Sequence, residues 1–400
     1  MKKENILVVS PFCAYKTIKH AGGKIHYYYL KKLEPEFNIT HISTARIDEK
    51  KDIENFGIQA KKIILYRKIN KNFIQKFIEN FQNYLTQRNP LDKYAGFIQY
   101  NQLHFFYKQI KELARKKFSP KYIILDWTQA IFTAKKVKKL FPKSKLICVE
   151  QDVTYLKYAR FAENTNNVIK KQVQLLKYKN IKKEELKALT YADEILTLNS
   201  KDSELIKKDI KSNKKIRVIA PFFDLYSNVK RKNISDRTII YFGAMSRPEN
   251  YLTAIWIIKN ILPSLESIDK LIIIGNNPDQ TLSQFASDKV VITGFVNDIK
   301  PFLENSLCFV APIVMGAGIK IKILEAMSSG IPVLTNELGI EGIPATKNQD
   351  YLFCKTKDDY IKSITLLEKD SNFAYKIGEN GKKFIDNNFN FELDSYIKGF

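Results

Sequence analysis

Short apolar runs, each followed by a stretch with helical periodicity, recur along most of this chain, and this alternation constrains the fold more than any other feature. In the first half the apolar runs lie at 6–9, 37–43, 61–66, 122–126, 146–150 and 194–198. A second alternating set extends from 238 to 356. Such alternation is typical of parallel sheets covered by helices on both faces. We therefore predict an α/β protein with two doubly wound, Rossmann-like domains.

The length of 400 residues agrees with this division, because one domain averages roughly 150 residues. Residues 1–211 are predicted to form the first domain and residues 238–388 the second. Residues 212–237, rich in Lys, Asn and Ser, are predicted to connect them. An apolar content of 44% is enough for a sizeable core in each domain.

The cysteines and histidines give no sign of a disulfide framework or a zinc site. Cys13, Cys148, Cys308 and Cys354 are far apart and form no C-x-x-C pair, and the four histidines show no ligand spacing. We expect buried thiols in a reducing cytosol and no metal ligands.

No targeting or membrane-spanning segment is expected. The N-terminal apolar run is only four residues long before Ser10 and Pro11, too short for a signal peptide, and no stretch approaches ~20 apolar residues. We expect a cytoplasmic protein, located in part at the inner face of the cell membrane.

The positive charge is concentrated in one half of the chain. Residues 1–200 contain 39 Lys and Arg against 18 Asp and Glu, whereas residues 201–400 contain 27 against 24. A Lys-rich genome composition explains much of the lysine count but not the asymmetry. Such a field attracts an anionic partner, which leaves lipid headgroups, an acidic or phosphorylated acceptor and nucleic acid as candidates.

A basic segment with an aromatic face lies at 70–87, with Phe73, Phe77 and Phe81 at helical spacing. It predicts an amphipathic helix. Such a helix either packs on the core or lies in a membrane interface, where it would suit a lipid-linked acceptor. Interleaved aromatic and basic residues also stack on single-stranded nucleic acid, but no RNA-binding signature accompanies these.

Residues 316–332 combine a glycine turn, two lysines and a glutamate at the start of a predicted helix. Gly316 and Gly318 allow the backbone to approach an anion, and Lys320 and Lys322 add positive charge. Glu325, one turn further on, is placed to accept hydrogen bonds from ribose hydroxyls. Solvated lysines and a surface salt bridge are the alternatives, evenly balanced for Lys322. The segment predicts a site for the phosphates and sugar of a nucleotide ligand.

This segment and its surroundings resemble the donor-binding half of GT-B glycosyltransferases, specifically the family-4-like group (glycosyltransferase group 1). The matching motifs are LEAM at 324–327, GIPV at 330–333, TIIYFGAM at 238–245, LIIIGNNP at 271–278 and VITGFV at 291–296, with YADEILTLNS at 191–200 in the first half. The resemblance implies two domains that face each other across a cleft, with the last helix, 389–400, crossing back toward the first domain. It also implies a nucleotide-sugar donor, retention of anomeric configuration and no obligatory metal or other cofactor. The chain contains no D-x-D motif.

The resemblance implies a set of donor-binding residues. They are Gly22, Gly23, Gly243, Arg247, Gly294, Gly316, Gly318, Ile319, Lys320 and Glu325. The chain also departs from the family pattern. Ala317 stands where many members have a second glutamate, eight positions before Glu325, so sugar recognition must differ. Met245, Asn250 and Tyr251 replace the usual arginine and Lys-Gly pair, which makes Arg247 and Lys320 the candidates for the missing charge.

Carboxylates follow two neighbouring strands of the first domain. Asp126 ends the run 122–126, and Glu150 and Asp152 follow the next run. We expect Glu150, Asp152 and Glu325 to take part in catalysis, with Glu150 the first choice. Asp126 and Arg160 are expected on the acceptor side. The alternative for Asp126 and Asp152 is that each caps the helix that follows it.

Together these features predict a glycosyltransferase that moves a sugar to a glycan or lipid-linked acceptor in surface polysaccharide synthesis. Its partners would be the nucleotide-sugar donor, the acceptor and, through the basic first domain, an anionic membrane. A sugar-nucleotide epimerase or hydrolase on the same fold is the first alternative, and a basic nucleic-acid-binding protein is the second.

Overall fold

The computed structural model describes residues 3–67, 89, 91–163, 165, 167–210, 213–231 and 237–389. The chain divides into two compact units, and the division falls between Phe222 and Phe223. The helix predicted at 70–87 lies outside the described residues, as does the helix predicted at 389–400 apart from Phe389.

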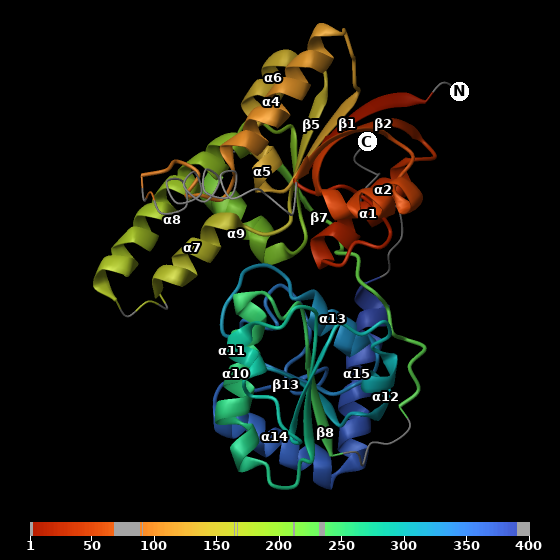
Figure 1. Cartoon of the computed structure of the whole chain (residues 1–400), viewed down its shortest axis with the longest axis vertical. Coiled ribbons are helices and arrows are strands. Elements are labelled where there is room, and N and C mark those ends of the chain that lie inside the picture. The colour runs from red at the N-terminus through yellow and green to blue at the C-terminus, as the bar shows by residue number, and fades with distance from the viewer. Residues whose placement is uncertain are drawn as a thin grey trace. The chain divides into compact units, whose positions relative to one another are not determined.

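The first unit is built on a seven-stranded parallel sheet with the order β3-β2-β1-β4-β5-β6-β7. Its strands are β1 (Glu4–Val9), β2 (Phe37–Arg46), β3 (Lys61–Arg67), β4 (Tyr122–Asp126), β5 (Lys145–Glu150), β6 (Glu194–Thr197) and β7 (Lys215–Val218). One face carries α1 (Ala21–Leu33) and α2 (Lys50–Phe56) (Figure 1). The other carries α4 (Tyr100–Arg115), α5 (Thr128–Ile131), α6 (Ala134–Leu140), α7 (Thr154–Glu163), α8 (Val168–Leu189) and α9 (Ser200–Ile210) (Figure 1).

The burial of the middle strands of this sheet explains why they could be predicted from the sequence. Val8 of β1, Ile124 of β4 and Ile147 of β5 have no exposed surface, because helices cover both faces of the sheet. A strand buried on both faces must be apolar along its whole length. The six strands predicted in the first half are confirmed as β1 to β6.

The strand β7 lies within the segment predicted as the interdomain connection, so the first domain extends past the predicted boundary at 211. It is an edge strand, and its side chains are exposed or half-buried. Lys215 and Arg217 pair with the buried Glu194 of β6. An edge strand can carry charged residues and needs no continuous apolar run. For this reason β7 was not predicted as a strand within its lysine-rich stretch.

The second unit contains a six-stranded parallel sheet with the order β10-β9-β8-β11-β12-β13. Its strands are β8 (Thr238–Phe242), β9 (Lys270–Ile274), β10 (Val290–Gly294), β11 (Cys308–Ala311), β12 (Val333–Thr335) and β13 (Leu352–Phe353). Helices α10 (Pro248–Asn260) and α11 (Gln280–Ser283) cover one face (Figure 1). Helices α12 (Lys300–Asn305), α13 (Ile321–Ser328) and α15 (Ser371–Asn388) cover the other, and α14 (Lys357–Lys369) completes the unit (Figure 1).

The strand order reverses once in each sheet, beside β1 in the first and beside β8 in the second. The chain leaves β1 toward β2 and later returns on the other side as β4, and it leaves β8 toward β9 and returns as β11. Ligands of open α/β sheets bind at the carboxyl ends of strands where the order reverses. These two positions, one in each unit, are where functional side chains are expected.

Candidate functional site

Two glycine-bearing loops border the reversal point of the second sheet. Gly243 begins the loop between β8 and α10, and residues 312–320 join β11 to α13. Gly316 and Gly318 have φ of 125° and 69°, which side-chain-bearing residues rarely adopt. The half-buried Ile319 follows Gly318, and α13 begins two residues later. Backbone can therefore come close to a ligand at this edge.

Lys322 is the central side chain of this site. It donates a hydrogen bond to the Tyr241 hydroxyl at 2.9 Å and another to the Asn250 side-chain oxygen, so it links α13 to β8 and α10. Burial lowers its pKa to about 7, although the residue keeps some exposed surface. The prediction left a solvated lysine and a ligand-binding lysine equally open at this position. The structure shows that Lys322 is held by protein groups.

Further charges surround Lys322, since Glu249, Lys320, Arg247 and Glu325 all act on its pKa. Lys320 donates to the Gly318 carbonyl at 2.6 Å and forms an ion pair with Glu341 at 3.6 Å, which offsets part of its charge. Arg247 lies at the N-cap of α10 and pairs with Glu249 at 3.2 Å. Both predicted cations thus lie near the reversal point.

Glu325 and the three residues that depart from the family pattern, Met245, Asn250 and Tyr251, are placed as follows. Glu325 is half-buried on α13 and lies near Tyr226, whose pKa burial raises and the Glu325 charge raises further. Met245 is fully buried, and Tyr251 is half-buried. Asn250 donates to the Ala244 carbonyl at 2.9 Å while its oxygen accepts from Lys322, so it fixes the loop after β8.

A row of glycines joins the carboxyl ends of β8, β9 and β10. The Gly243 amide donates to the Ile274 carbonyl at 3.0 Å, and the Gly275 amide donates to the Gly294 carbonyl at 2.9 Å. A Cβ at Gly275 would lie 1.7 Å from the Gly243 carbonyl oxygen, whereas one at Gly294 would meet nothing within 4 Å. Gly275 therefore sets the position of the Gly243 loop, a role that local sequence did not indicate.

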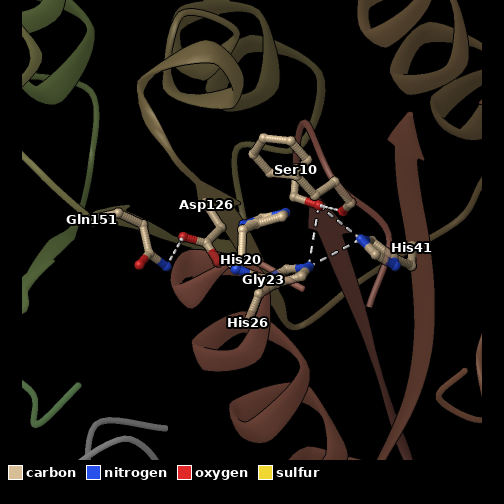
Figure 2. Close-up of polar contacts among 8 residues, drawn as sticks. Ser10, His20, Gly23, His26, His41, Asp126 and Gln151 are labelled. Atoms are coloured by element: carbon tan, nitrogen blue, oxygen red, sulfur yellow. Dashed lines mark hydrogen bonds and ion pairs between the residues drawn. The ribbon is translucent and has the colours of Figure 1, made fainter. Parts of the chain in front are cut away.

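The reversal point of the first sheet contains a chain of buried polar side chains (Figure 2). Asp126, at the end of β4, accepts from His26 Nδ1 at 2.6 Å and from Gln151 Nε2 at 3.0 Å. Ser10, just after β1, contacts His26 Nε2 at 3.2 Å and His41 Nε2 at 2.9 Å. All five residues are buried.

This network joins side chains that are far apart in the sequence. The histidines carried no ligand spacing in the sequence, yet His26 of α1 and His41 of β2 meet over Ser10. Asp126 binds His26 and Gln151 and does not cap the following helix, whose N-cap is Trp127, so the alternative of a capping role is wrong. Burial and the neighbouring His26 hold the pKa of His41 well below its usual range, so His41 is neutral.

The start of α1 packs against the loop after β4. His20 caps the helix by accepting from the Gly23 amide at 3.0 Å. A Cβ at Gly22 would lie 2.8 Å from the Trp127 indole, and one at Gly23 would lie 2.3 Å from Ile18. Glycine at both positions therefore allows the start of α1 to pack closely on its neighbours, and any side chain there would displace Trp127 or Ile18.

Glu150, the first choice for catalysis, has no exposed surface. It accepts from the Thr128 hydroxyl at 3.0 Å, and its Oε1 is buried with no protein partner among the described residues. Burial raises its pKa well above the usual range, and the nearby Glu185 raises it further. Glu185 is itself buried, accepts from two backbone amides of α7 and has its pKa raised to about 8 by burial. Asp152 is exposed, and Arg160 is half-buried on α7.

We predict that Glu150→Gln reduces the loss of stability that accompanies a rise in pH from about 5 to 8. A carboxyl whose native pKa is raised keeps its proton when the unfolded chain has lost it, so each such group lowers the unfolding free energy by up to about 1.4 kcal/mol per pH unit between the unfolded and native pKa. The variant removes one of two such groups. The measurement is urea unfolding between about pH 5 and 8, followed by Trp127 fluorescence in a Trp256→Phe background.

The same variant tests the catalytic role. If Glu150 has only a structural role in the core, Glu150→Gln retains transferase activity. A loss of activity by several orders of magnitude with unchanged stability supports the catalytic assignment.

Among the described residues no cluster of three or more His, Cys, Asp or Glu is arranged to hold a metal ion. No helix in the described ranges is long and apolar enough to cross a membrane.

Residues 236–370, most of the second unit, match the family model described as glycosyl transferases group 1. Over the whole chain, a curated relative is the uncharacterized 44.6 kDa protein in the cps region of Klebsiella pneumoniae, 23% identical over 408 residues with 96% of each chain covered.

Solved structures resemble the chain along its whole length. Sucrose-phosphate synthase from Thermosynechococcus elongatus aligns with a TM-score of 0.72 at 13% identity, covering 99% of this chain and 98% of that chain. HepE of Anabaena, solved in complex with UDP, aligns with a TM-score of 0.67 at 11% identity, with the same coverage. At these identities the likeness establishes the fold, which is GT-B with two Rossmann-like domains.

Proposed function

We propose that this chain, a GT-B glycosyltransferase whose second domain matches the group 1 family, transfers a sugar from a nucleotide-sugar donor to a glycan or lipid-linked acceptor. The observation that carries the proposal is the position of Lys322. A lysine held between Tyr241 and Asn250, beside two glycine loops at a reversal point, suits the phosphates of a nucleotide.

In the proposed reaction the second domain binds the donor. Lys322, Lys320 and Arg247 stabilise the negative charge that develops on the leaving nucleotide, and the loop at Gly316 and Gly318 contributes backbone amides. Glu325 binds hydroxyls of the ribose or the sugar. We further propose that transfer retains the anomeric configuration of the sugar. Side chains, and no metal ion, would supply the positive charge that stabilises the leaving nucleotide.

The proposed pathway is surface polysaccharide synthesis. A relative of the chain is encoded in a cps region, and HepE was solved with UDP, a nucleoside diphosphate, which agrees with a nucleotide-sugar donor. The basic first half suits a phosphorylated or lipid-linked acceptor at the cytoplasmic face of a membrane. Flotation of the protein with vesicles containing about a third anionic lipid, against neutral vesicles, tests the membrane contact.

A thermal-shift panel tests the donor site. UDP-, GDP-, ADP- and CMP-sugars are added to the wild type and to Glu325→Ala, and at least one nucleotide is expected to raise the melting temperature of the wild type and to stabilise the variant less. If no nucleotide stabilises the wild type, the donor-site proposal is wrong. Incubation with the stabilising donor alone then separates a transferase from an epimerase or hydrolase, which would alter the sugar without an acceptor.

We predict that nucleotide affinity falls as the pH rises above neutrality. The pKa of Lys322 is about 7 in the free protein, and bound phosphates favour its charged form. Below pH 7 the lysine already carries its proton, whereas above pH 7 binding must take one up, so the dissociation constant is expected to rise toward about tenfold per pH unit. Calorimetry in two buffers of different ionisation enthalpy measures the proton uptake. Affinity that is constant between about pH 7 and 9 would contradict the assignment.

A further inference from the structure

Trp127 occupies a strained position in the first domain. It follows β4 directly, with φ of 68° and ψ of 151°. For a bulky residue such a positive φ is unfavourable, and it persists only where the surrounding structure enforces it. The Trp127 amide donates to the Val149 carbonyl at 3.0 Å, and the preceding Asp126 is held by His26 and Gln151. These contacts hold the backbone at Asp126 and Trp127 in this conformation.

The indole belongs to a group of half-buried aromatic rings. Its centroid lies 5.1 Å from that of Phe12 in an edge arrangement, and the Phe12 ring lies 4.4 Å from His20. Phe12 follows β1, His20 caps α1 and Trp127 follows β4, so the three rings gather at the reversal point of the sheet. Gly22 lies directly under the indole, where a Cβ would come within 2.8 Å of it.

We propose that Trp127, supported by Phe12 and His20, is the stacking platform for a pyranose ring of the acceptor. The apolar C–H face of a sugar packs on an indole, and pockets that combine aromatic rings with a few polar groups bind such amphipathic rings. The ring of His26, which belongs to the Asp126 network, lies 5.3 Å from the Trp127 ring between centroids. In the same network Gln151 leaves a buried amide oxygen without a protein partner among the described residues.

A sugar is favoured over a nucleotide base because the cations suited to phosphates lie in the second domain, around Lys322. That this ring belongs to an acceptor rests on the proposed transferase function. The geometry of the platform does not depend on that function. Experiments can therefore reject the platform and the transferase function separately.

Fluorescence can address Trp127 alone, because the chain has two tryptophans and Trp256→Phe leaves a single emitter in the first domain. The probes are the methyl glycosides of glucose, galactose, N-acetylglucosamine and rhamnose. We expect a saturable change in emission with at least one glycoside at millimolar concentration, and no change with the nucleotide alone. No response to any of the four, or a response to the nucleotide only, overturns the proposal.

Trp127→Phe keeps an aromatic ring, whereas Trp127→Leu removes it, so glycoside affinity measured by calorimetry is expected to fall little in the first and about tenfold or more in the second. Gly22→Ala should displace the indole and so weaken binding, although the tryptophan itself is retained in the sequence. Phe56→Leu, at an exposed aromatic residue of α2 outside this group, is the control and should bind as wild type.

Nucleotide-induced thermal stabilisation of the same variants serves as the reference. If Trp127→Leu keeps its response to the nucleotide and also binds glycosides as wild type, the platform is wrong and the donor site stands. If no variant responds to a nucleotide, the proposed function fails whatever Trp127 does.

Discussion

Lys322→Met is expected to weaken nucleotide binding by about a hundredfold or more, equivalent to about 2.7 kcal/mol. Lys322 reaches Tyr241 and Asn250 from α13, and its ammonium group is the charge at the centre of the glycine loops. Methionine has a similar length and no charge. Because burial already lowers the pKa of Lys322 to about 7, we expect the variant to fold with stability close to that of the wild type. Calorimetry with the nucleotide identified in the thermal-shift panel measures the loss.

The matched control is Lys362→Met, at an exposed position of α14 in the same domain, which should bind as wild type. Lys322→Met should also abolish the pH dependence predicted above pH 7. A variant that binds the nucleotide as tightly as the wild type would show that Lys322 only joins α13 to the sheet.

Gly275→Ala is expected to destabilise the second domain by about 3 kcal/mol or more, and to abolish nucleotide binding. The new methyl group would lie 1.7 Å from the Gly243 carbonyl oxygen, so the loops after β8 and β9 must move apart. The atom that the new Cβ would meet is a backbone oxygen, so no flexible side chain can move aside at this contact. Urea unfolding, followed by Trp256 fluorescence in a Trp127→Phe background, reports the second domain.

Gly294→Ala separates steric from conformational effects. Its φ is 70°, but a Cβ there would meet nothing within 4 Å, so we expect the free energy of unfolding to fall by only about 1 kcal/mol. Equal losses for the two variants would show that the contact between Gly275 and Gly243 is not what holds this edge together.

The alternation of strands and helices could be predicted because burial of a parallel strand leaves a local mark. The run 122–126 coincides with β4, and 6–9 lies within β1, since both strands are enclosed by helices and must be apolar throughout. The strand β7 left no such mark, because an edge strand with charged side chains resembles a connecting loop.

The candidate site of the second domain was partly predictable for a similar reason. Glycines with positive φ and the residues that follow them form one continuous segment. The local sequence at 316–325 was therefore enough to predict a glycine loop that a ligand could approach. Lys322 contacts Tyr241 and Asn250, which are more than 70 positions away in the sequence. The local pattern therefore could not distinguish this lysine from a solvated one.

Sequence by itself determined the fold class, the two-domain division and the glycine-rich edge at 316–325, because each depends on periodicity or backbone freedom within a short segment. Tertiary structure alone decided which polar groups meet. His26 and Asp126 are 100 positions apart and form a buried pair, Glu150 turned out to lie in the interior, and Trp127 is held at the reversal point of the sheet. Contacts between distant strands depend on the topology of the chain. The order of residues within a short segment does not reveal which distant segments will meet.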